Sequence, residues 1–124
     1  MPKKEYNREL VAAVVLIKKY IDDHPGTGLS TAALARDNNI SRNVLQKVFK
    51  FKFHKPIGRY KLLKRMEEAR RLLKSGWSIK EVSFKLGYSS PSTFSDAFRH
   101  FYKISPSEWL HAIKYNNKRQ KIKE

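Results

Sequence analysis

Apolar residues recur at intervals of three and four along most of the chain, which is the spacing of helices that bury one face. The pattern predicts an all-α protein of about seven helices. A long helix over residues 57–74 separates two pairs of short ones. The other helices are expected over 5–23 and 31–38, within 89–101, and after Ser41, Ser78 and Ser105.

Local side-chain chemistry marks where most of these helices start. Ser30 and Ser41 are placed as N-caps, because a serine hydroxyl accepts a hydrogen bond from an otherwise unpaired backbone amide. Ser89 or Ser90 has the same role before Pro91, whose missing N–H costs nothing in the first helical turn. Two further starts have capping boxes, Ser78 with Glu81 and Ser105 with Glu108.

The two pairs of short helices form an internal repeat. Asn39 and Gly87 stand at the turn within each pair, and both residue types tolerate the left-handed backbone region. The offset is 48 residues before the turn and 49 after it, so the second turn carries one extra residue. In sequence order, Ala35, Asn39, Leu45 and Phe49 correspond to Ser83, Gly87, Phe94 and Phe98.

Two short helices joined by a tight turn are typical of a helix-turn-helix, whose second helix reads a groove of DNA. One such pair alone is equally compatible with a helical hairpin that has a solvated face. The repeated pattern favours DNA recognition, because a duplicated arrangement is harder to obtain by chance than either half.

The sequence divides into four segments. We expect a first helix-turn-helix subdomain over 5–54, a connecting helix within 55–75, a second subdomain over 76–115 and a disordered basic tail over 116–124. The 18-residue connecting helix would be about 27 Å long. Successive major-groove segments on one side of B-DNA lie about 34 Å apart. One chain is therefore expected to read adjacent segments of an asymmetric site, and we expect the DNA to bend.

Charge supports a polyanionic partner. The net charge is +16 with a pI near 10.2, and residues 1–40 hold only six of the 27 Lys and Arg beside five of the 11 Asp and Glu. The excess of positive charge therefore lies in residues 41–124, which contain the long helix and the second pair of short helices. Apolar segments are too short for a membrane span.

Several function classes are disfavoured by what the sequence contains. There is no cysteine, so thiolate metal sites and thiol nucleophiles are excluded and a reducing compartment is favoured. The four histidines show no i, i+4 pairing suited to a metal. We therefore expect no enzyme, no metal and no cofactor.

One stretch is similar to a known signature. Residues 79–101 read I-K-E-V-S-F-K-L-G-Y-S-S-P-S-T-F-S-D-A-F-R-H-F, and residues 104–108 read I-S-P-S-E. On these residues the chain resembles the AraC/XylS family of bacterial transcription regulators, over about 8–113. The resemblance implies seven helices in two subdomains, with the third and sixth helices in the major groove.

The same resemblance places the DNA contacts. Amide side chains suit adenine, Arg and Lys suit guanine, and a carboxylate can accept from N4 of cytosine. The expected base contacts are Arg42, Asn43, Gln46, Lys47, Ser92, Thr93, Ser95 and Asp96. The expected phosphate contacts are Ser41, Lys50, Arg59, Lys74, Lys80, Ser90, Arg99 and Lys103.

The chain departs from the family pattern in four places. His54 and Lys103 stand where members often have Gly after a reading helix, and Pro56 stands where many have Ser or Thr. Asp96 is unusual because its charge repels phosphate. It is interpreted either as a specificity element or, preferably, as an intrahelical partner of Arg99 or Lys103.

The function expected from these features is sequence-specific binding of double-stranded DNA that regulates transcription. The alternative is a nonspecific architectural nucleic-acid-binding module, on which bases would stack against Trp77, Tyr88 and the phenylalanines, although the helical spacing of these residues favours core packing. RNA polymerase is a candidate partner, and the location is expected to be cytoplasmic and nucleoid-associated. The chain is expected to act as a monomer, or as part of a dimer if it is the output domain of a longer protein; Met1 favours a stand-alone regulator.

Overall fold

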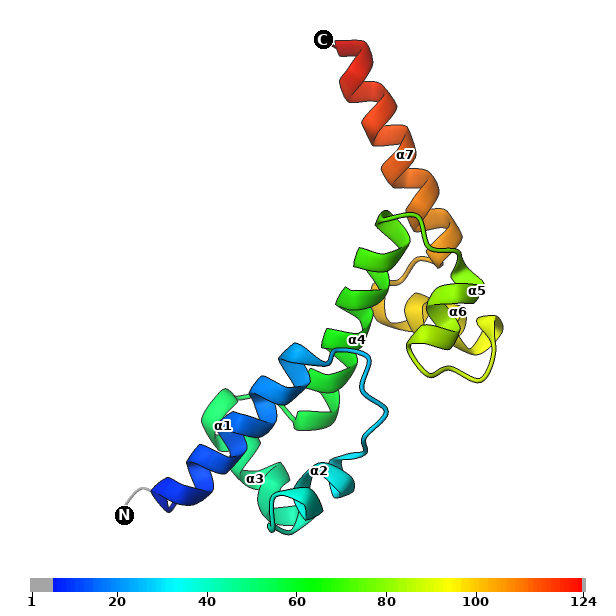
Figure 1. The fold of residues 1–124 in the computed structure, drawn as a ribbon. Helices are drawn as coiled ribbons and strands as arrows, with labels where there is room; N and C mark the ends of the chain where they lie inside the picture. Colours follow the sequence, from blue (N-terminus) through cyan, green and yellow to red (C-terminus); the bar gives the residue numbers. More distant parts are fainter. Residues whose placement is uncertain (1–5, 124) are drawn as a thin grey trace. The chain divides into compact units, whose positions relative to one another are not determined.

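The computed structural model describes the backbone of residues 6–123 and the side chains as far as residue 117. Within that range the chain is all-α, as predicted, and has seven helices (Figure 1). Their bounds are α1 (Arg8–Asp23), α2 (Thr31–Asp37), α3 (Arg42–Phe53), α4 (Ile57–Lys74), α5 (Ile79–Lys85), α6 (Pro91–Tyr102) and α7 (Pro106–Lys123). No helix in the described part is long and apolar enough to cross a membrane.

The chain divides into two compact units, Met1–Arg65 and Met66–Glu124, and the boundary lies inside α4. The first turns of α4 therefore pack in the first unit and its last turns in the second. The segment predicted as a connector also supplies core residues to both units.

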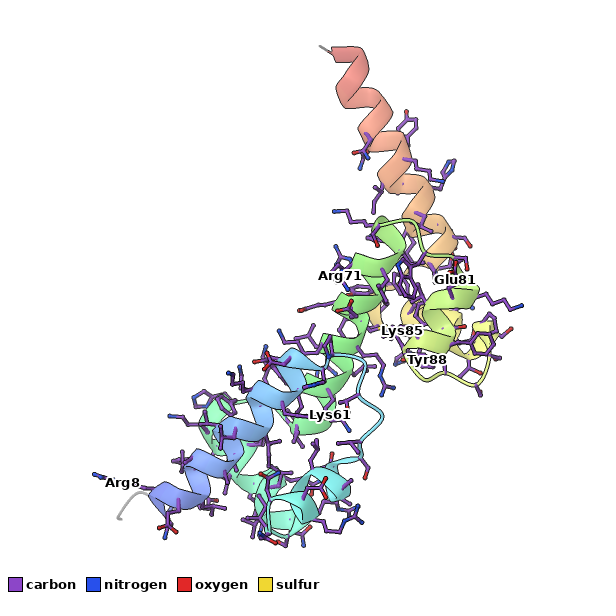
Figure 2. All side chains as sticks on the ribbon, viewed as in Figure 1. Arg8, Lys61, Arg71, Glu81, Lys85 and Tyr88 are labelled. Carbon is purple, nitrogen blue, oxygen red and sulfur yellow. The ribbon has the colours of Figure 1, made fainter. Side chains whose placement is uncertain are left out.

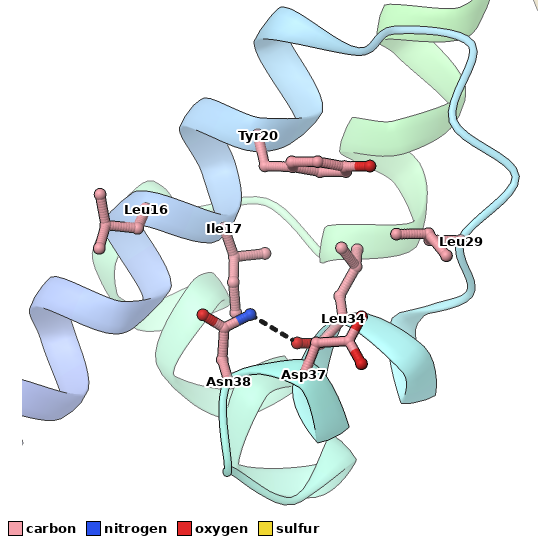
Figure 3. Close-up of a pocket in the computed structure, with 7 residues that line it drawn as sticks. All are labelled: Leu16, Ile17, Tyr20, Leu29, Leu34, Asp37 and Asn38. Atoms are coloured by element: carbon pink, nitrogen blue, oxygen red, sulfur yellow. Dashed lines mark hydrogen bonds between the residues drawn. The ribbon is translucent and has the colours of Figure 1, made fainter.

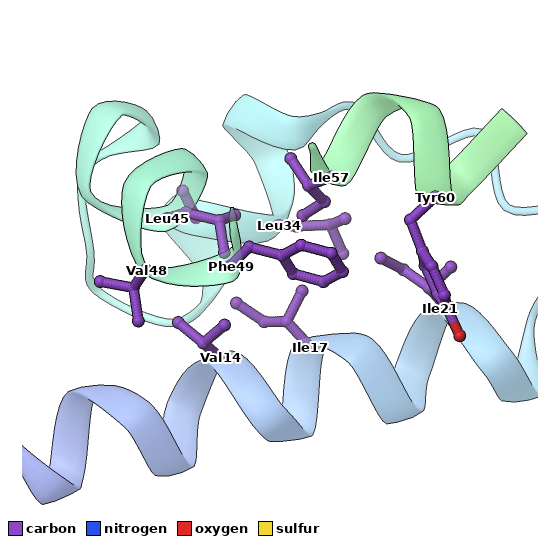
Figure 4. Close-up of a cluster of buried hydrophobic side chains, with 10 residues drawn as sticks. Val14, Ile17, Ile21, Leu34, Leu45, Val48, Phe49, Ile57 and Tyr60 are labelled. Carbon is purple, nitrogen blue, oxygen red and sulfur yellow. The ribbon is translucent and has the colours of Figure 1, made fainter. Parts of the chain in front are cut away.

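The core of the first unit forms where α1 and α3 pack together with α2 and the start of α4 (Figure 4). Phe49 is fully buried at its centre and its ring contacts those of Phe53 and Tyr60, at centroid distances of 4.9 and 5.6 Å. Burying such apolar side chains contributes about 2 kcal/mol each. The other buried members are Val14, Ile17, Ile21, Leu34, Ala35, Leu45, Val48, Ile57 and Tyr60.

The core of the second unit is built from aromatic residues of α6. Phe94 and Phe98 are fully buried, with centroids 5.9 Å apart, and Phe98 also contacts Trp109 at 6.0 Å. The spacing of four residues places both rings on one side of α6, as the sequence predicted. The remaining buried apolar residues of this unit are Met66, Ala69, Leu72, Leu73, Val82 and Leu86.

The two helix pairs repeat in structure as well as in sequence. Asn39 and Gly87 both have positive φ, 58° and 83°. The residue after each of them donates a backbone hydrogen bond to the preceding helix. Ile40 N–H donates to the Ala35 carbonyl at 3.0 Å, and Tyr88 N–H donates to the Ser83 carbonyl at 2.9 Å.

The extra residue of the second turn is located by the N-caps. Ser41 Oγ accepts from the Val44 amide and Ser90 Oγ accepts from the Thr93 amide, both at 3.1 Å. The turns match as far as Tyr88, and the helices match again from Ser90. Ser89 is therefore the additional residue.

Most of the predicted helix starts are confirmed by hydrogen bonds. Ser78 and Glu81 form the complete capping box of α5. Ser105 Oγ accepts from the Glu108 amide at 3.1 Å at the start of α7. At α4, the carbonyl of Pro56 accepts from the Tyr60 amide at 3.0 Å, so proline occupies the position where Ser or Thr was expected.

Cations of α4 fix the loop that leads into α2. Lys61 Nζ, labelled in Figure 2, donates to the carbonyl of Leu29 at 2.6 Å. Arg65 donates to the carbonyl of Thr27 at 3.0 Å. Burial lowers the pKa of Lys61, and the nearby Arg65 lowers it further. These two side chains therefore satisfy carbonyl groups of the loop by hydrogen bonds, and they are less available to an outside ligand.

A partly buried carboxylate joins the end of α1 to α4. Asp22 accepts hydrogen bonds from Lys18, at 3.0 Å, and from the Tyr60 hydroxyl, and Lys64 Nζ lies 3.7 Å away. Burial alone would raise the pKa of Asp22, but the hydrogen bonds from Tyr60 and Lys18 outweigh it and the net shift is downward. The same bond with Asp22 raises the pKa of Lys18, against the opposing effect of burial.

The two ends of the chain differ from the prediction. The first helix was expected from residue 5, which lies outside the described residues, and α1 begins at Arg8 with Asn7 as its N-cap. The basic tail over 116–124 was expected to be disordered, but α7 continues to Lys123. Lys, Arg and Gln are good helix formers and no Gly or Pro interrupts them, which favours continuation of the helix.

Candidate nucleic-acid interface

Helix α3 presents a cationic and amide-bearing face. Arg42 and Gln46 are one turn apart, as are Asn43 and Lys47, and all four side chains are exposed. Lys50 continues this face, while Leu45, Val48 and Phe49 anchor the opposite side. The four residues expected to contact bases are therefore presented together on one helix.

The corresponding face of α6 is composed differently. Ser92, Thr93 and Asp96 are exposed, and Ser95 is half-buried. The Thr93 hydroxyl pairs with Ser90 Oγ at 2.9 Å, so part of its hydrogen-bonding capacity is already used within the protein. This face combines hydroxyls with one carboxylate, whereas that of α3 is cationic.

The expected phosphate contacts fall into two groups. Ser41 and Ser90 hold the first amides of their helices, so their hydroxyls are fixed at the N-termini of α3 and α6. The cationic members, Lys50, Arg59, Lys74, Lys80, Arg99 and Lys103, are all exposed.

On α4, internal contacts separate engaged cations from available ones. Arg71 forms an ion pair with Glu68, and the hydrogen bonds of that pair raise the pKa of Arg71. The Arg70 guanidinium lies over the rings of Tyr102 and Trp109, at 4.9 and 5.2 Å from their centroids.

Two other cations of α4 are free of such contacts. Among the described residues, the structure shows no hydrogen bond or ion pair from Arg59 or Lys74. These are the two residues of α4 that the sequence selected as phosphate contacts.

Asp96 lies beside cations without pairing with them. It lines a shallow hollow together with Arg99, His100 and Lys103. Within the described part of the chain no ion pair joins Asp96 to any of these residues, so the preferred interpretation of Asp96 as an intrahelical partner is not supported. His100 was missed at this place, although its spacing of four residues from Asp96 was a usable signal.

A second hollow, of about 310 Å³, lies in the first unit (Figure 3). It is largely apolar, and Asn38 donates to the Leu34 carbonyl at 2.8 Å on its wall. Leu16 lines it and is 62% exposed. No local sequence pattern indicated this hollow, because its lining comes from α1, α2 and the loop between them. The lining residues are Leu16, Ile17, Tyr20, Leu29, Leu34, Asp37 and Asn38.

With this geometry established, comparison with known proteins identifies the family. A family model described as a helix-turn-helix domain matches residues 34–112, which is more than half of the chain. The Msm operon regulatory protein of Streptococcus mutans is 33% identical over 114 residues, covering 91% of this chain and 41% of that protein. The chain belongs to the AraC/XylS family of bacterial transcription regulators.

Relatives differ in length. The regulatory protein SoxS of Escherichia coli K12 is 30% identical over 95 residues, covering 76% of this chain and 89% of SoxS. The chain spans less than half of the first curated relatives that it matches, between 30 and 41% of their length. These relatives are regulators, in agreement with the expectation of a regulator rather than an enzyme.

Solved structures agree with the fold. The C-terminal domain of AraT, a response regulator from Geobacillus stearothermophilus, has a TM-score of 0.76 and 26% identity, and the match covers 86% of this chain and 88% of that domain. The DNA-binding domain of AdpA, solved with a target DNA, also has a TM-score of 0.76, with 22% identity and coverage of 84% and 95%.

Proposed function

We propose that the chain binds double-stranded DNA sequence-specifically and thereby regulates transcription. The observation that carries this proposal is the repeated, anchored reading helix. In both units a buried apolar side fixes a 12-residue helix whose opposite side exposes hydrogen-bonding groups. Helices held in this way are suited to reading base edges in the major groove.

We propose that bases are read by the exposed polar faces of α3 and α6, and that the surrounding serines and cations bind phosphate. The available cations support this assignment, since Arg59 and Lys74 have no internal partner in the described structure while Arg70 and Arg71 do. Such contacts position the protein on the duplex and make its affinity dependent on salt.

We further propose that both reading helices engage one asymmetric duplex site and that this DNA bends. The unlike composition of the two faces supports asymmetry, because unlike faces do not select a palindrome. A gel assay with circularly permuted sites tests the bend through position-dependent mobility. Binding as a monomer, contact with RNA polymerase and a cytoplasmic, nucleoid-associated location are parts of the same proposal.

The decisive experiment is selection of bound duplexes from a random pool, followed by titration at several salt concentrations. A sequence-specific regulator enriches one motif and shows both a steep salt slope and a large ratio of specific to random affinity. A nonspecific module, the alternative function, shows the slope without a motif.

A further inference from the structure

The two reading helices carry opposite charges at one equivalent position. The N-caps Ser41 and Ser90 correspond at an offset of 49 residues, which is also the offset between the buried residues of α3 and α6. At this offset Lys47 corresponds to Asp96. Both side chains are exposed, on the same face of their respective helices.

Asp96 is not neutralised within its own helix. Arg99 and His100 lie one turn further along α6, and Lys103 is the C-cap of that helix. All three line a hollow together with Asp96. None of them forms an ion pair with it in the described structure. The carboxylate therefore remains available to a ligand, although it lies on a surface that is otherwise suited to phosphate.

Major-groove chemistry limits what such a carboxylate can bind. A carboxylate only accepts hydrogen bonds, and the groove offers donors only at N4 of cytosine and N6 of adenine. In adenine the acceptor N7 lies beside the amino group and repels the second carboxylate oxygen. Guanine presents two acceptors, and thymine an acceptor and a methyl group.

We propose that Asp96 is a specificity-determining residue that selects cytosine at one base pair of the DNA site. This inference rests on the proposed function of α6 as a reading helix. Asp96 favours the matching base through its hydrogen bond and disfavours other sites, because an unsatisfied carboxylate in the groove is repelled by acceptors and phosphates. The order of preference at that base pair is cytosine, then adenine, then guanine and thymine.

The test combines random-pool selection with titration of single-base variants of the selected duplex, using the full chain. Wild type should prefer cytosine over guanine or thymine at one position, roughly fivefold to a hundredfold. Asp96→Ala should lose that preference and bind random DNA more tightly. Asp96→Asn should shift the preference to adenine, and Asp96→Lys, which copies Lys47, should shift it to guanine.

A matched control separates charge from recognition. Asp23→Asn removes one exposed carboxylate from α1 and should leave every base preference unchanged. Circular dichroism should show the same helix content for all variants, because Asp96 is exposed.

The two proposals fail in different ways. If wild type selects a motif but Asp96→Ala keeps the same preference at every position, or if the lost preference is for guanine or thymine, the role of Asp96 is disproved and the regulator function stands. If wild type selects no motif, both proposals are wrong.

Discussion

His54 and Lys103 are equivalent residues that end the two reading helices in the left-handed conformation, with φ of 61° and 66°. Each donates its amide to the carbonyl four residues earlier, at 2.8 and 2.7 Å. Gly is the residue that the family pattern led us to expect at these two positions. The backbone conformation that Gly adopts without strain is thus retained here by residues that have a Cβ.

We expect His54→Gly to stabilise the first unit by up to about 1 kcal/mol. Removing the Cβ relieves the left-handed strain, which is partly offset by the greater entropy of Gly in the unfolded chain. Urea unfolding followed by circular dichroism measures the change. His54→Ala is the control, since it keeps a Cβ and should give no gain. Equal stabilisation by both variants would show that strain is not the cause.

Gly87 should be sensitive to substitution for the converse reason. Its φ of 83° suits Gly, and a Cβ added at this position would meet no atom within 4 Å, so the cost of Gly87→Ala is conformational. We expect a loss of about 1 kcal/mol in thermal or urea unfolding.

Gly58→Ala provides the comparison for Gly87. It also meets no neighbouring atom, but it lies in α4 at an ordinary helical φ. It should stabilise the protein slightly, because Ala has a higher helix propensity. If both alanine variants destabilised the chain equally, the left-handed conformation of Gly87 would not explain its cost.

Asp22 should make stability depend on acid pH. The pKa of Asp22 is lowered in the folded state, so its contribution to the free energy of unfolding is complete above the unfolded-state pKa near 3.8. That contribution is lost as the pH falls through the lower folded-state pKa. We expect Asp22→Asn to be about 1 kcal/mol less stable than wild type near neutral pH, with the difference disappearing in strong acid.

Urea titrations between about pH 6 and pH 2 test this expectation. Asp23→Asn is the matched control, because Asp23 is the exposed neighbour of Asp22 on α1. It should leave the pH profile close to that of wild type. A constant difference between Asp22→Asn and wild type at every pH would contradict the proposed origin.

Base and phosphate contacts should respond differently to alanine substitution. We expect Arg42→Ala or Gln46→Ala to relax preference at one base pair by about 1 to 3 kcal/mol. Lys74→Ala should weaken binding to all sequences alike. It should also reduce the salt dependence of the affinity by about the amount that one phosphate contact contributes. Arg71→Ala is a useful control for Lys74, because Arg71 is already paired with Glu68. A base-specific effect of Lys74→Ala would contradict its assignment to phosphate.

The sequence by itself determined the helices, most of their starts and the repeat. These features depend on signals between residues three or four positions apart, such as Ser78 with Glu81, or on buried periodicity such as Phe94 with Phe98. The sequence also selected the exposed polar residues of α3 and α6 as a candidate site, because amphipathic spacing determines which side of a helix remains outside.

Only the tertiary structure decided which charged residues remain available. Lys61 and Arg65 are engaged by carbonyls more than 30 positions away, and Tyr60 reaches Asp22 across a similar separation. No local pattern encodes such contacts, because they arise when separate helices pack. The lack of an ion pair to Asp96 among the described residues was equally undetermined by the sequence. Its i, i+3 spacing to Arg99 permits a pair but does not enforce one against solvation of both charges.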